Sequence, residues 1–243
     1  MVNQITLTGM VLSAMPVNEY DKRLVILTKE RGKITAFAKG ARRPHSKYIA
    51  GSRPLSFGSF VVYEGRNAYN LVDISIDNYF EEIVTDIDSV YYGFYFLELA
   101  EYFTSENVEA KDNLNLLYVS LKALINKQIP NELIRRIYEL KIFAIHGEYP
   151  SIFSCARCGS KEGLSHFAVS LDGALCNECV LKNDEAISVN TSTFYAMQYV
   201  ISSPLNKLYS FNVSEEVLTE LRMIMSRFMK KHIEKEFNSE ELL

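Results

Sequence analysis

The sequence lacks long apolar runs and is sparing with the residues that build loop-rich proteins. Its 243 residues include 11 Gly and 6 Pro, slightly few for a scaffold made mainly of loops. No apolar run approaches the roughly 20 residues that a membrane-spanning helix needs. The first ten residues mix apolar with polar side chains, which is typical of a strand and not of a signal peptide. We therefore expect a cytoplasmic protein with no membrane segment.

The common catalytic motifs are missing as well. The sequence contains no Gly-x4-Gly-Lys-Ser/Thr phosphate loop, no Gly-x-Gly-x2-Gly, no Gly-x-Ser-x-Gly and no His-Glu-x2-His. Its four histidines are widely scattered, at His45, His146, His166 and His232. Acid pairs such as Asp86 and Asp88 fit solvated helix ends better than acid–base chemistry. We therefore expect no catalytic residues and no enzymatic activity.

An ordinary globular composition hides an uneven distribution of charge. Apolar residues make up 48% of the chain and charged residues 23%, which suits one large or two small domains with a sizeable core. Residues 1–80 hold 11 Lys and Arg against 6 Asp and Glu, a net charge of +5, whereas the remainder holds 15 against 24, a net charge of −9. This asymmetry predicts a basic binding module joined to an acidic one.

Positive charge is concentrated between residues 22 and 53. Ten cationic side chains in this segment accompany one acid, Glu30, and they are Lys22, Arg23, Lys29, Arg31, Lys33, Lys39, Arg42, Arg43, Lys47 and Arg53. So many like charges repel one another unless a polyanion neutralises them, and nucleic acid phosphates do so with release of counterions. The alternative is a solvated hairpin whose charges balance the acidic half.

Three aromatic residues near these charges are candidates for stacking on an unpaired base. Phenylalanines such as Phe37 and Phe57 are more often core residues than stacking platforms. Tyr48 lies in a polar loop without an apolar period. We therefore expect Tyr48, and not the two phenylalanines, to be the stacking residue.

The first 80 residues follow the pattern of short strands. Strands are expected over residues 4–12, 23–28, 34–40, 59–64 and 70–76. A turn at 29–33 contains Gly32, which can adopt a positive φ. Residues 42–54 have no apolar period and are expected to form a mobile basic loop. Five short antiparallel strands in about 80 residues predict a small closed or partly open barrel.

From residue 81 the apolar period becomes helical, and only residues 150–181 interrupt it. Helices are expected over residues 89–103, 113–127, 131–147, 192–202 and 214–237. We therefore predict an α+β protein with four segments. These are a five-stranded β-barrel domain at 1–80, the first part of a helical domain at 81–149, an insertion at 150–181 and the second part of the helical domain at 182–243.

All four cysteines fall in this insertion. They form two Cys-x2-Cys pairs separated by 17 residues, and their members are Cys155, Cys158, Cys176 and Cys179. This spacing is typical of a tetrahedral zinc site, because two intervening residues let both thiolates of a pair face one ion at about 2.3 Å. Asp172 and Gly173 predict a hairpin turn between the pairs. The sequence therefore predicts a zinc ribbon that holds one Zn²⁺ ion.

Two disulfides, or four free thiols, would use the same cysteines differently. Disulfides are disfavoured in a cytoplasmic chain, and a redox dithiol would need a βαβ context that the pattern lacks. Four sulfur ligands fill a tetrahedral ion and leave no open position, so we expect a structural zinc and not a catalytic one. His166 lies between the two pairs, where a surface or supporting role is favoured over ligation.

The order of these parts is similar to that of a known family. The first strand carries Gly9-Met10-Val11-Leu12, and the basic hairpin carries Gly32-Lys33 followed by Gly40-Ala41-Arg42-Arg43. A helix from Leu140 runs into Gly147-Glu148-Tyr149-Pro150 before the cysteines. Over its whole length the chain resembles the bacterial RecO family of recombination mediators. The resemblance implies an OB-fold barrel that binds single- and double-stranded DNA and a helical domain that supports it.

The resemblance also implies an activity and partners. Members of the family anneal complementary strands and help to load RecA onto coated single strands without nucleotide hydrolysis. Their partners are RecR and the C-terminal tail of the single-strand-binding protein, and the expected location is cytoplasmic and nucleoid-associated. Because all four cysteines are retained, a bound zinc is implied. The DNA-binding residues carried over by position are Lys22, Arg23, Lys33, Lys39, Arg42 and Arg43, to which the basic loop adds Lys47 and Tyr48.

The pocket for the tail is expected to be an apolar groove in the helical domain beside a cation that meets the tail carboxylate. Candidates for this cation are Arg135, Lys141 and Arg222. Two other functions remain open on the sequence. An RNA-binding OB-fold protein would use the same basic barrel, and a zinc-dependent nucleic-acid hydrolase would need an open zinc position with a base nearby.

Overall fold

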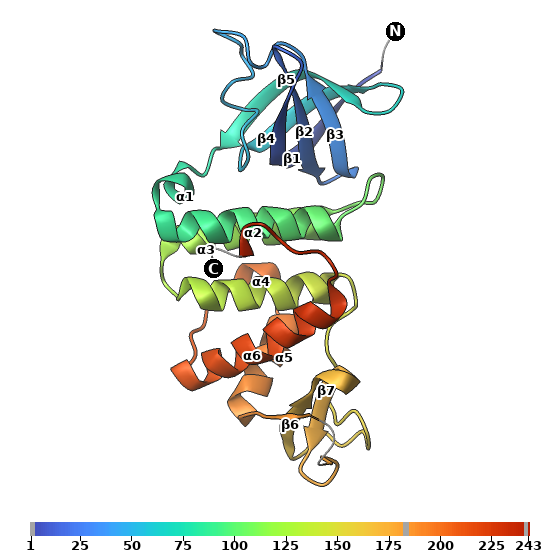
Figure 1. The fold of residues 1–243 in the computed structure, drawn as a ribbon, viewed down its shortest axis with the longest axis vertical. Helices are drawn as coiled ribbons and strands as arrows, with labels where there is room; N and C mark the ends of the chain where they lie inside the picture. The colour runs from blue at the N-terminus through green and yellow to red at the C-terminus, as the bar shows by residue number, and fades with distance from the viewer. Residues whose placement is uncertain (1–2, 182–184, 241–242) are drawn as a thin grey trace. The chain divides into compact units, whose positions relative to one another are not determined.

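A computed structural model describes residues 3–181, 185–240 and 243, and its first five strands form a barrel (Figure 1). They are β1 (Gln4–Val17), β2 (Asp21–Thr28), β3 (Gly32–Ala38), β4 (Phe57–Glu64) and β5 (Tyr69–Asn78). The barrel is closed, with the strand order β1-β2-β3-β5-β4. The predicted five-stranded barrel is therefore confirmed. One pair differs from the expectation, because β3 and β5 run parallel while the other neighbours are antiparallel.

The sequence of β3 explains why it forms a barrel wall. Ile34, Ala36 and Ala38 are buried in the barrel core, and the residues between them, Thr35 and Phe37, are only half-buried. Successive side chains of a strand point to opposite faces, so the first set faces inward and the second faces outward. Burial of the inward apolar side chains is the main favourable contribution to the stability of such a barrel.

The segment between β3 and β4, predicted as a mobile loop, packs against the barrel instead. It is a succession of turns from residue 39 to residue 55. The N–H of Val11 in β1 donates to the carbonyl of Ser56 at 3.0 Å, and the carbonyl of Val11 accepts from the N–H of Leu55 at 3.0 Å. The side chain of Leu55 is fully buried. Apolar periodicity does not predict that this segment packs against β1, because backbone hydrogen bonds make much of the contact.

Three helices continue the same compact unit. They are α1 (Glu81–Thr85), α2 (Ile87–Phe103) and α3 (Lys111–Asn126). Gly93 lets them approach closely, since a Cβ at this position would lie 2.9 Å from the side chain of Ile83 and 3.7 Å from that of Leu121. The unit comprises Met1–Ile125 and Phe237–Leu243. The first unit thus combines the barrel, these three helices and the segment that follows the second unit in the sequence.

The second compact unit spans Asn126–Glu236. Its helices are α4 (Asn131–Ile145), α5 (Thr191–Ser202) and α6 (Glu215–His232), and its strands are β6 (Leu164–Ala168), β7 (Gly173–Cys176) and β8 (Ile187–Ser188). Short 3-10 turns cover Val169–Leu171 and Leu205–Lys207. The strands form a sheet in the order β7-β6-β8. The predicted hairpin between the cysteine pairs is confirmed, and it turns at Asp172, where φ is 49°.

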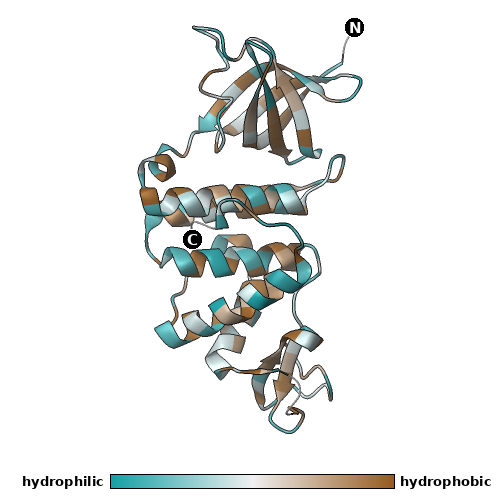
Figure 2. Ribbon diagram, viewed as in Figure 1, coloured by the Kyte–Doolittle hydropathy of each residue, from teal (hydrophilic) through white to brown (hydrophobic). Residues whose placement is uncertain are grey.

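Amphipathic helices build the core of this second unit. The buried positions of α6 recur every three or four residues, at Val217, Leu218, Leu221, Ile224, Met225, Phe228 and Met229. Hydrophobic and hydrophilic stretches alternate along the helices accordingly (Figure 2). The hydroxyl of Ser214 caps α6 by accepting from the N–H of Val217 at 3.4 Å. None of the helices in the described part of the chain is both long and apolar enough to cross a bilayer.

Helix α6 is shorter than the sequence pattern predicted. The pattern extended to residue 237, but the helix ends at His232 and Ile233 adopts extended backbone, with φ −119°. The ring of Phe237 is 3% exposed, and its centroid lies 5.8 Å from that of Tyr95 and 5.9 Å from that of Tyr102. Burying such a ring contributes about 1.5–3 kcal/mol, more than the few tenths that a residue gains by remaining helical.

Candidate functional site

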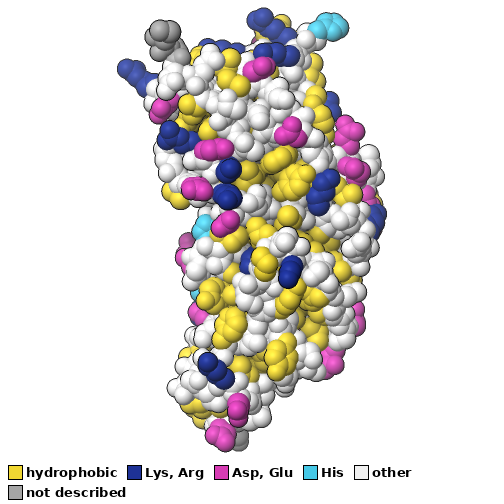
Figure 3. All heavy atoms as spheres, turned by 180° about the vertical axis from the view of Figure 1, so that it is seen from behind, with side chains coloured by type: hydrophobic (Ala, Val, Ile, Leu, Met, Phe, Trp, Pro, Cys, Tyr) yellow, Lys and Arg dark blue, Asp and Glu magenta, His cyan; other side chains and the backbone are white. Residues whose placement is uncertain are grey.

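The predicted cationic residues of the barrel are mostly at its surface. Exposed members of the set are Arg23, Lys39, Arg42, Arg43 and Lys47. Lys and Arg side chains are spread over the barrel, at the top of the view in Figure 3, with a few acidic side chains among them. These cationic side chains of the barrel are therefore exposed to solvent, where they produce a positive potential.

Lys22 holds the segment after β3 against the barrel. Its Nζ donates to the carbonyl of Ser52 at 3.3 Å and to the hydroxyl of the same residue at 3.0 Å. Burial lowers the pKa of the Lys22 ammonium group, and the nearby positive charges of Arg53 and Arg42 lower it further. Three cations are thus crowded together. A phosphate group placed beside them would relieve their mutual repulsion.

Lys33 anchors the β2–β3 hairpin to the helices of the same unit. Its Nζ donates to the carbonyl of Glu101 near the end of α2 at 2.7 Å, and its backbone N–H donates to the carbonyl of Ser105 at 3.2 Å. A cation is favourable at this end of a helix because the last carbonyls carry partial negative charge. Sequence reasoning placed Lys33 among the DNA-binding residues, and in the structure its ammonium group is already bonded.

Lys47 and Tyr48 are both held by β5. Lys47 Nζ lies 2.7 Å from Asp73 Oδ1, and this hydrogen bond raises the pKa of Lys47 and lowers the pKa of Asp73. The hydroxyl of Tyr48 donates to the carbonyl of Val72 at 2.6 Å, and its ring packs against the barrel core. The ring that sequence reasoning selected for stacking on a base is therefore engaged within the barrel.

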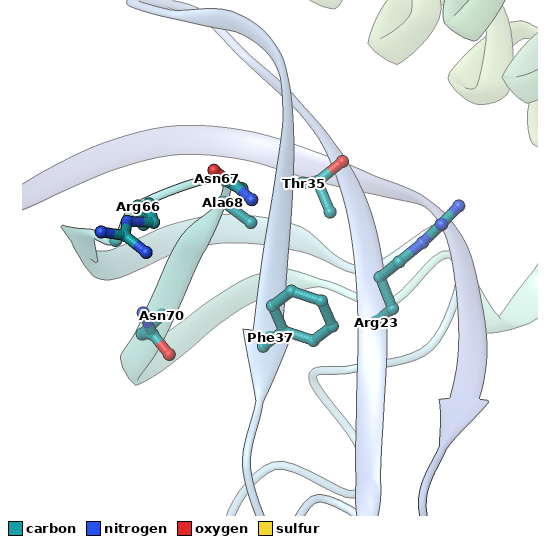
Figure 4. Close-up of a pocket in the computed structure, with 8 residues that line it drawn as sticks. Arg23, Thr35, Phe37, Arg66, Asn67, Ala68 and Asn70 are labelled. Atoms are coloured by element: carbon teal, nitrogen blue, oxygen red, sulfur yellow. The ribbon is translucent and has the colours of Figure 1, made fainter.

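A different aromatic ring lines an open depression on the outer face of the barrel (Figure 4). Strand register sets its neighbours. Phe37 on β3 pairs with Arg23 on β2 and with Asn70 on β5, and the β4–β5 turn adds Arg66 and Asn67. We call this site the Phe37 depression. Its volume is about 490 Å³.

The lining of the Phe37 depression combines one aromatic ring with cations and amides. The polar residues around Phe37 are Arg23, Thr35, Arg66, Asn67 and Asn70, and none of the lining residues that the structure describes is acidic. In the close-up, Arg23 and Arg66 lie on opposite sides of the ring (Figure 4). Aromatic rings stack on bases and guanidinium groups neutralise phosphates. The chemistry of the depression therefore suits a segment of single-stranded nucleic acid.

Sequence reasoning missed much of this depression. Arg66 lies outside the basic run at residues 22–53, and Asn70 looked like an ordinary strand residue. Phe37 was expected in the core, although its alternation with Ile34 and Ala36 signals the opposite face of β3. A strict count of odd and even positions would have found the ring. Only the barrel register places Arg66 and Asn70 beside it.

The four cysteines meet in the ribbon as predicted. The Gly159 N–H donates to the carbonyl of Cys155 at 2.9 Å, which forms a tight turn at the first pair. All four Sγ atoms lie within 4.8 Å of one another, and Cys158 Sγ lies 3.8 Å from Cys176 Sγ. A disulfide would need about 2.05 Å. A tetrahedron with metal–sulfur bonds of about 2.3 Å has edges of about 3.8 Å, so the cluster fits one metal ion.

Electrostatics of the cluster also favour a cation. Burial alone would raise the pKa of the Cys155 thiol, but N–H donors of Cys158, Cys176 and Arg157 outweigh it and lower the pKa to about 6. Hydrogen bonds with the thiols of Cys158 and Cys176 raise the pKa of Cys179 to about 12. Neighbouring thiols thus compete for negative charge. A divalent ion would let all four ionise together.

The three cations considered for the tail pocket lie in different environments. Arg135 and Lys141 on α4 are 5% and 8% exposed. Arg135 Nε donates to Glu139 Oε1 at 2.8 Å, and Lys141 Nζ donates to the carbonyls of Ile201 and Ser203 at 2.8 and 2.7 Å. These two side chains therefore stabilise the interior of the second unit. Arg222 on α6 is exposed.

A groove with exposed aromatic rings lies between the ribbon and α5. It has a volume of about 430 Å³, and its lining includes Phe153, Lys161, Glu162, Leu164, Phe194 and Tyr195. Tyr195 is 68% exposed and Phe153 is 43% exposed. Exposed aromatic rings gathered in a groove are typical of protein contact sites. We call this site the ribbon groove.

Two family models match the chain in adjoining parts. The model described as "Recombination protein O N terminal" matches residues 1–80. The model described as "Recombination protein O C terminal" matches residues 84–241. The first match covers the barrel with the Phe37 depression, and the second covers the helices, the cysteine cluster and the ribbon groove.

Curated relatives match over nearly the whole chain, and each of the three that follow is named "DNA repair protein RecO". The protein of Acetivibrio thermocellus is 31% identical, over 97% of this chain and 94% of its own length. The protein of Alkaliphilus metalliredigens is 31% identical, over 96% of each chain. The protein of a Thermoanaerobacter species is 30% identical, over 97% of this chain and 95% of its own.

Proposed function

Because this chain belongs to the recombination protein O family of DNA repair proteins, we propose that it is a non-catalytic mediator of repair and recombination. In this proposal the barrel binds single- and double-stranded DNA and anneals complementary strands. Together with RecR, the protein helps to load RecA onto strands that are coated by the single-strand-binding protein. The Phe37 depression is flanked by two arginines, its described lining residues include no acid, and it is the observation that carries the proposal.

Annealing follows from the charge of the barrel. Two complementary strands approach slowly because both are polyanions. Cations such as Arg23, Arg42 and Arg43 would bind one strand, lower its net charge and thereby raise the local concentration of the second strand. Phosphate contacts carry no base information, so strands of any sequence would be accepted. No covalent bond is made or broken in this process, and no nucleotide hydrolysis is required.

We propose that the cysteine cluster holds one Zn²⁺ ion. Support comes from the convergence of four thiols and from the fit of the Cys158–Cys176 distance to a tetrahedral edge. Zinc with four thiolate ligands has no open position for water, so its role would be to hold the ribbon together. This argument disfavours a zinc-dependent hydrolase.

For the tail of the single-strand-binding protein we propose the ribbon groove. Its exposed rings, Phe153 and Tyr195, would pack against an apolar end of the tail, and Lys161 would meet a carboxylate. The second unit lies within the acidic part of the sequence, which would repel DNA and leave this surface to a protein partner. The exposed Arg222 is a second candidate cation, whereas Arg135 and Lys141 are buried.

The experiment that tests the proposed function measures binding of fluorescent oligonucleotides by anisotropy over a range of salt concentrations. We expect the logarithm of the affinity for single strands to fall with the logarithm of salt, with a slope of about 0.7 per phosphate contact. The double variant Arg42→Glu/Arg43→Glu should weaken binding to all sequences alike and reduce this slope. Arg222→Glu/Arg227→Glu, which reverses two exposed arginines on α6, is the matched control.

Annealing of two complementary strands is followed in the same samples. The wild-type protein should accelerate it, and the Arg42→Glu/Arg43→Glu variant should lose most of the acceleration. Single-stranded RNA of the same sequence forms a further arm, since tighter binding to RNA than to DNA would favour an RNA-binding function. An affinity that does not change with salt would contradict the proposal.

A further inference from the structure

We propose that copies of this chain associate through two surfaces of opposite charge in the first compact unit, and that DNA competes with this association. One surface surrounds α1 and is acidic, and the other lies at the turn between β1 and β2 and is basic. The association itself goes beyond the proposed function, and only the competition by DNA rests on that function.

The acidic surface comes from a stretch of sequence without cations. Residues 67–110 hold ten Asp and Glu and no Lys, Arg or His. Where its helices begin, exposed side chains mix acids with apolar residues, and we call this set the α1 surface. Its members are Asp77, Tyr79, Glu81, Glu82, Val84 and Ile87. Because one short segment of chain carries all of them, they are neighbours at the surface.

The apolar members of the α1 surface favour contact with protein. Ile87 is 70% exposed and Val84 is 58% exposed. An open hollow of about 550 Å³ in the same segment includes Tyr79 and Phe80 in its lining, together with Glu82. Exposed apolar side chains with a polar rim are typical of protein interaction sites. Contact with a second protein surface would remove these side chains from water.

The charge of the α1 surface selects the kind of surface that can cover it. Among the residues that the structure describes, Asp77, Glu81 and Glu82 take part in no ion pair. One cation reaches the hollow from α3, since Lys122 Nζ lies 5.3 Å from the centroid of the Phe80 ring. Three carboxylates beside one ammonium group leave a net negative charge. A covering surface must therefore bring further cations.

The basic surface has the same make-up with the opposite charge. Arg43 Cζ lies 5.3 Å from the centroid of the Tyr20 ring, and the N–H of Arg42 donates to the carbonyl of Tyr20 at 2.8 Å. Tyr20 is 40% exposed, and Met15 in β1 of the same hairpin is 57% exposed. Glu19 is an exposed acid in the turn, so the two arginines leave a net positive charge. We call Met15, Tyr20, Arg42 and Arg43 the Tyr20 surface.

The two surfaces complement each other, which identifies a second copy of this chain as the occupant. The α1 surface offers apolar side chains with carboxylates, and the Tyr20 surface offers apolar side chains with guanidinium groups. Two α1 surfaces would repel each other, and so would two Tyr20 surfaces. The contact therefore joins unlike surfaces. It can close as a dimer with two such contacts or continue from copy to copy as a chain.

DNA would compete for the Tyr20 surface. The proposed function assigns Arg42 and Arg43 to phosphate binding, and a guanidinium group that holds a phosphate cannot also hold Glu81 or Glu82 of another copy. A DNA strand carries many phosphates and gains from the release of counterions. Binding of a strand would therefore separate the copies, and these arginines would be covered only while DNA is absent.

Sedimentation velocity of the wild-type protein at about 0.1 M and about 1 M salt tests the association, since these concentrations screen charges beyond about 10 and 3 Å. We expect particles of two or more chains at the lower salt concentration and single chains at the higher. An oligonucleotide of about 12 nucleotides, enough for about one barrel, should restore single chains at the lower concentration. Single chains at both concentrations without DNA would overturn the inference.

Charge reversal identifies the two surfaces. Glu81→Lys/Glu82→Lys and Arg42→Glu/Arg43→Glu should each remain single chains at the lower salt concentration. An equimolar mixture of the two variants should associate again, because each variant then presents a surface opposite in charge to one on the other. Glu106→Lys/Glu109→Lys reverses two exposed acids of the same cation-free stretch and is the matched control. A mixture that stays as single chains while the control associates would refute the assignment.

The outcomes separate this inference from the proposed function. If the protein associates at low salt but does not bind the oligonucleotide, the proposed function fails and the contact between copies stands. If the oligonucleotide binds and the copies remain together, the proposed function stands, and a contact through the Tyr20 surface is overturned.

A second measurement uses the wild-type protein and does not depend on a folded variant. Equal amounts of unlabelled and heavy-nitrogen protein are mixed at low salt and treated with a carbodiimide, which joins a carboxylate to a lysine amine. Lys39 is exposed and lies three residues before Arg42. We expect mixed-label peptides in which Glu81 or Glu82 is joined to Lys39. Mixed-label cross-links confined to other lysines, or none at all, would overturn the inference.

Discussion

At the residue scale, the position of one side chain relative to the barrel wall decides what it can bind. Phe37 and Tyr48 are both half-buried aromatic residues in the basic part of the chain. The Tyr48 hydroxyl is bonded to the carbonyl of Val72 and its ring packs against the core, whereas Phe37 lines an outer depression. The polar sequence around Tyr48 favoured Tyr48 as the residue that stacks on a base. The alternation of side chains along β3, however, assigns Phe37 to the outer face of the barrel.

A pH-dependent contribution to stability is expected from His146 at the end of α4. Burial lowers the pKa of this imidazole below its ordinary value of 6.5, and the nearby Glu148 opposes the shift. The unfolded chain therefore binds a proton more readily than the folded chain. Stability that depends on the neutral ring is fully present above pH 6.5 and is lost as the pH falls below it.

The free energy of unfolding should fall less in His146→Gln than in the wild type when the pH is lowered from about 7.5 to 5.5. The difference should be about a few tenths of a kcal/mol, because the imidazole ring is partly solvated. Urea unfolding of both proteins at each pH measures the difference. Because the variant is compared with wild type at each pH, effects of other titrating groups cancel. Equal pH dependence in the two proteins would refute the expectation.

At the element scale, the turn between β2 and β3 ties the barrel to the helices of its unit. Gly32 has φ 63°, and a Cβ at this position would lie 2.1 Å from the carbonyl oxygen of Ser105 and 2.4 Å from that of Val108. Backbone hydrogen bonds from Lys33 to Ser105 and from Asn107 to Arg31 hold the two segments together. Position 32 of this turn therefore has no room for a side chain.

We expect Gly32→Ala to destabilise the protein by about 2 kcal/mol or more, since it combines the cost of a left-handed residue with the clash. Gly40→Ala is the matched control. Gly40 also has a positive φ, of 69°, but its Cβ would approach nothing closer than 3.6 Å. Thermal or urea unfolding of both variants separates the cost of the left-handed backbone from the cost of the clash. If the two variants are equally destabilised, the structure relieves the clash at position 32 without cost.

The ribbon that contains the four cysteines allows a second prediction at this scale. If the cysteine cluster holds zinc, purified protein should contain about one metal ion per chain. Removal by a chelator should expose the ribbon to proteolysis, because metal-binding energy is folding energy in such small elements. Cys176→Ser should do the same, whereas Ser165→Ala in β6 should retain the metal. Metal analysis and limited proteolysis report the result, and metal-free protein with an intact ribbon would contradict it.

At the scale of the whole molecule, the end of the chain belongs to the same compact unit as the barrel. Phe237 packs against Tyr95 and Tyr102 of α2, and the N–H of Ser239 donates to Glu98 Oε2 at 3.2 Å. These contacts join residues that are more than a hundred positions apart. They stabilise the first unit only after the chain through the second unit has been made.

We expect Phe237→Ala to destabilise the first unit by about 3–5 kcal/mol, the usual cost of deleting a buried phenylalanine ring. Tyr195→Ala removes an exposed ring in the second unit and should have little effect. Urea unfolding followed by a signal from the barrel measures the change. A loss as small as that of Tyr195→Ala would show that the end of the chain contributes little.

Local patterns in the sequence were enough to predict most helices and strands of this protein and the grouping of its cysteines. Period-two and helical spacing are local properties, so they predicted the barrel strands, most helix positions and the ribbon hairpin, and a metal-ligand spacing of two residues is equally local. Three features became visible only in the folded chain: the parallel pairing of β3 with β5, the end of α6 at His232, and the proximity of Arg23, Phe37 and Arg66. These features depend on strand register and on burial between distant segments, and no local pattern records either.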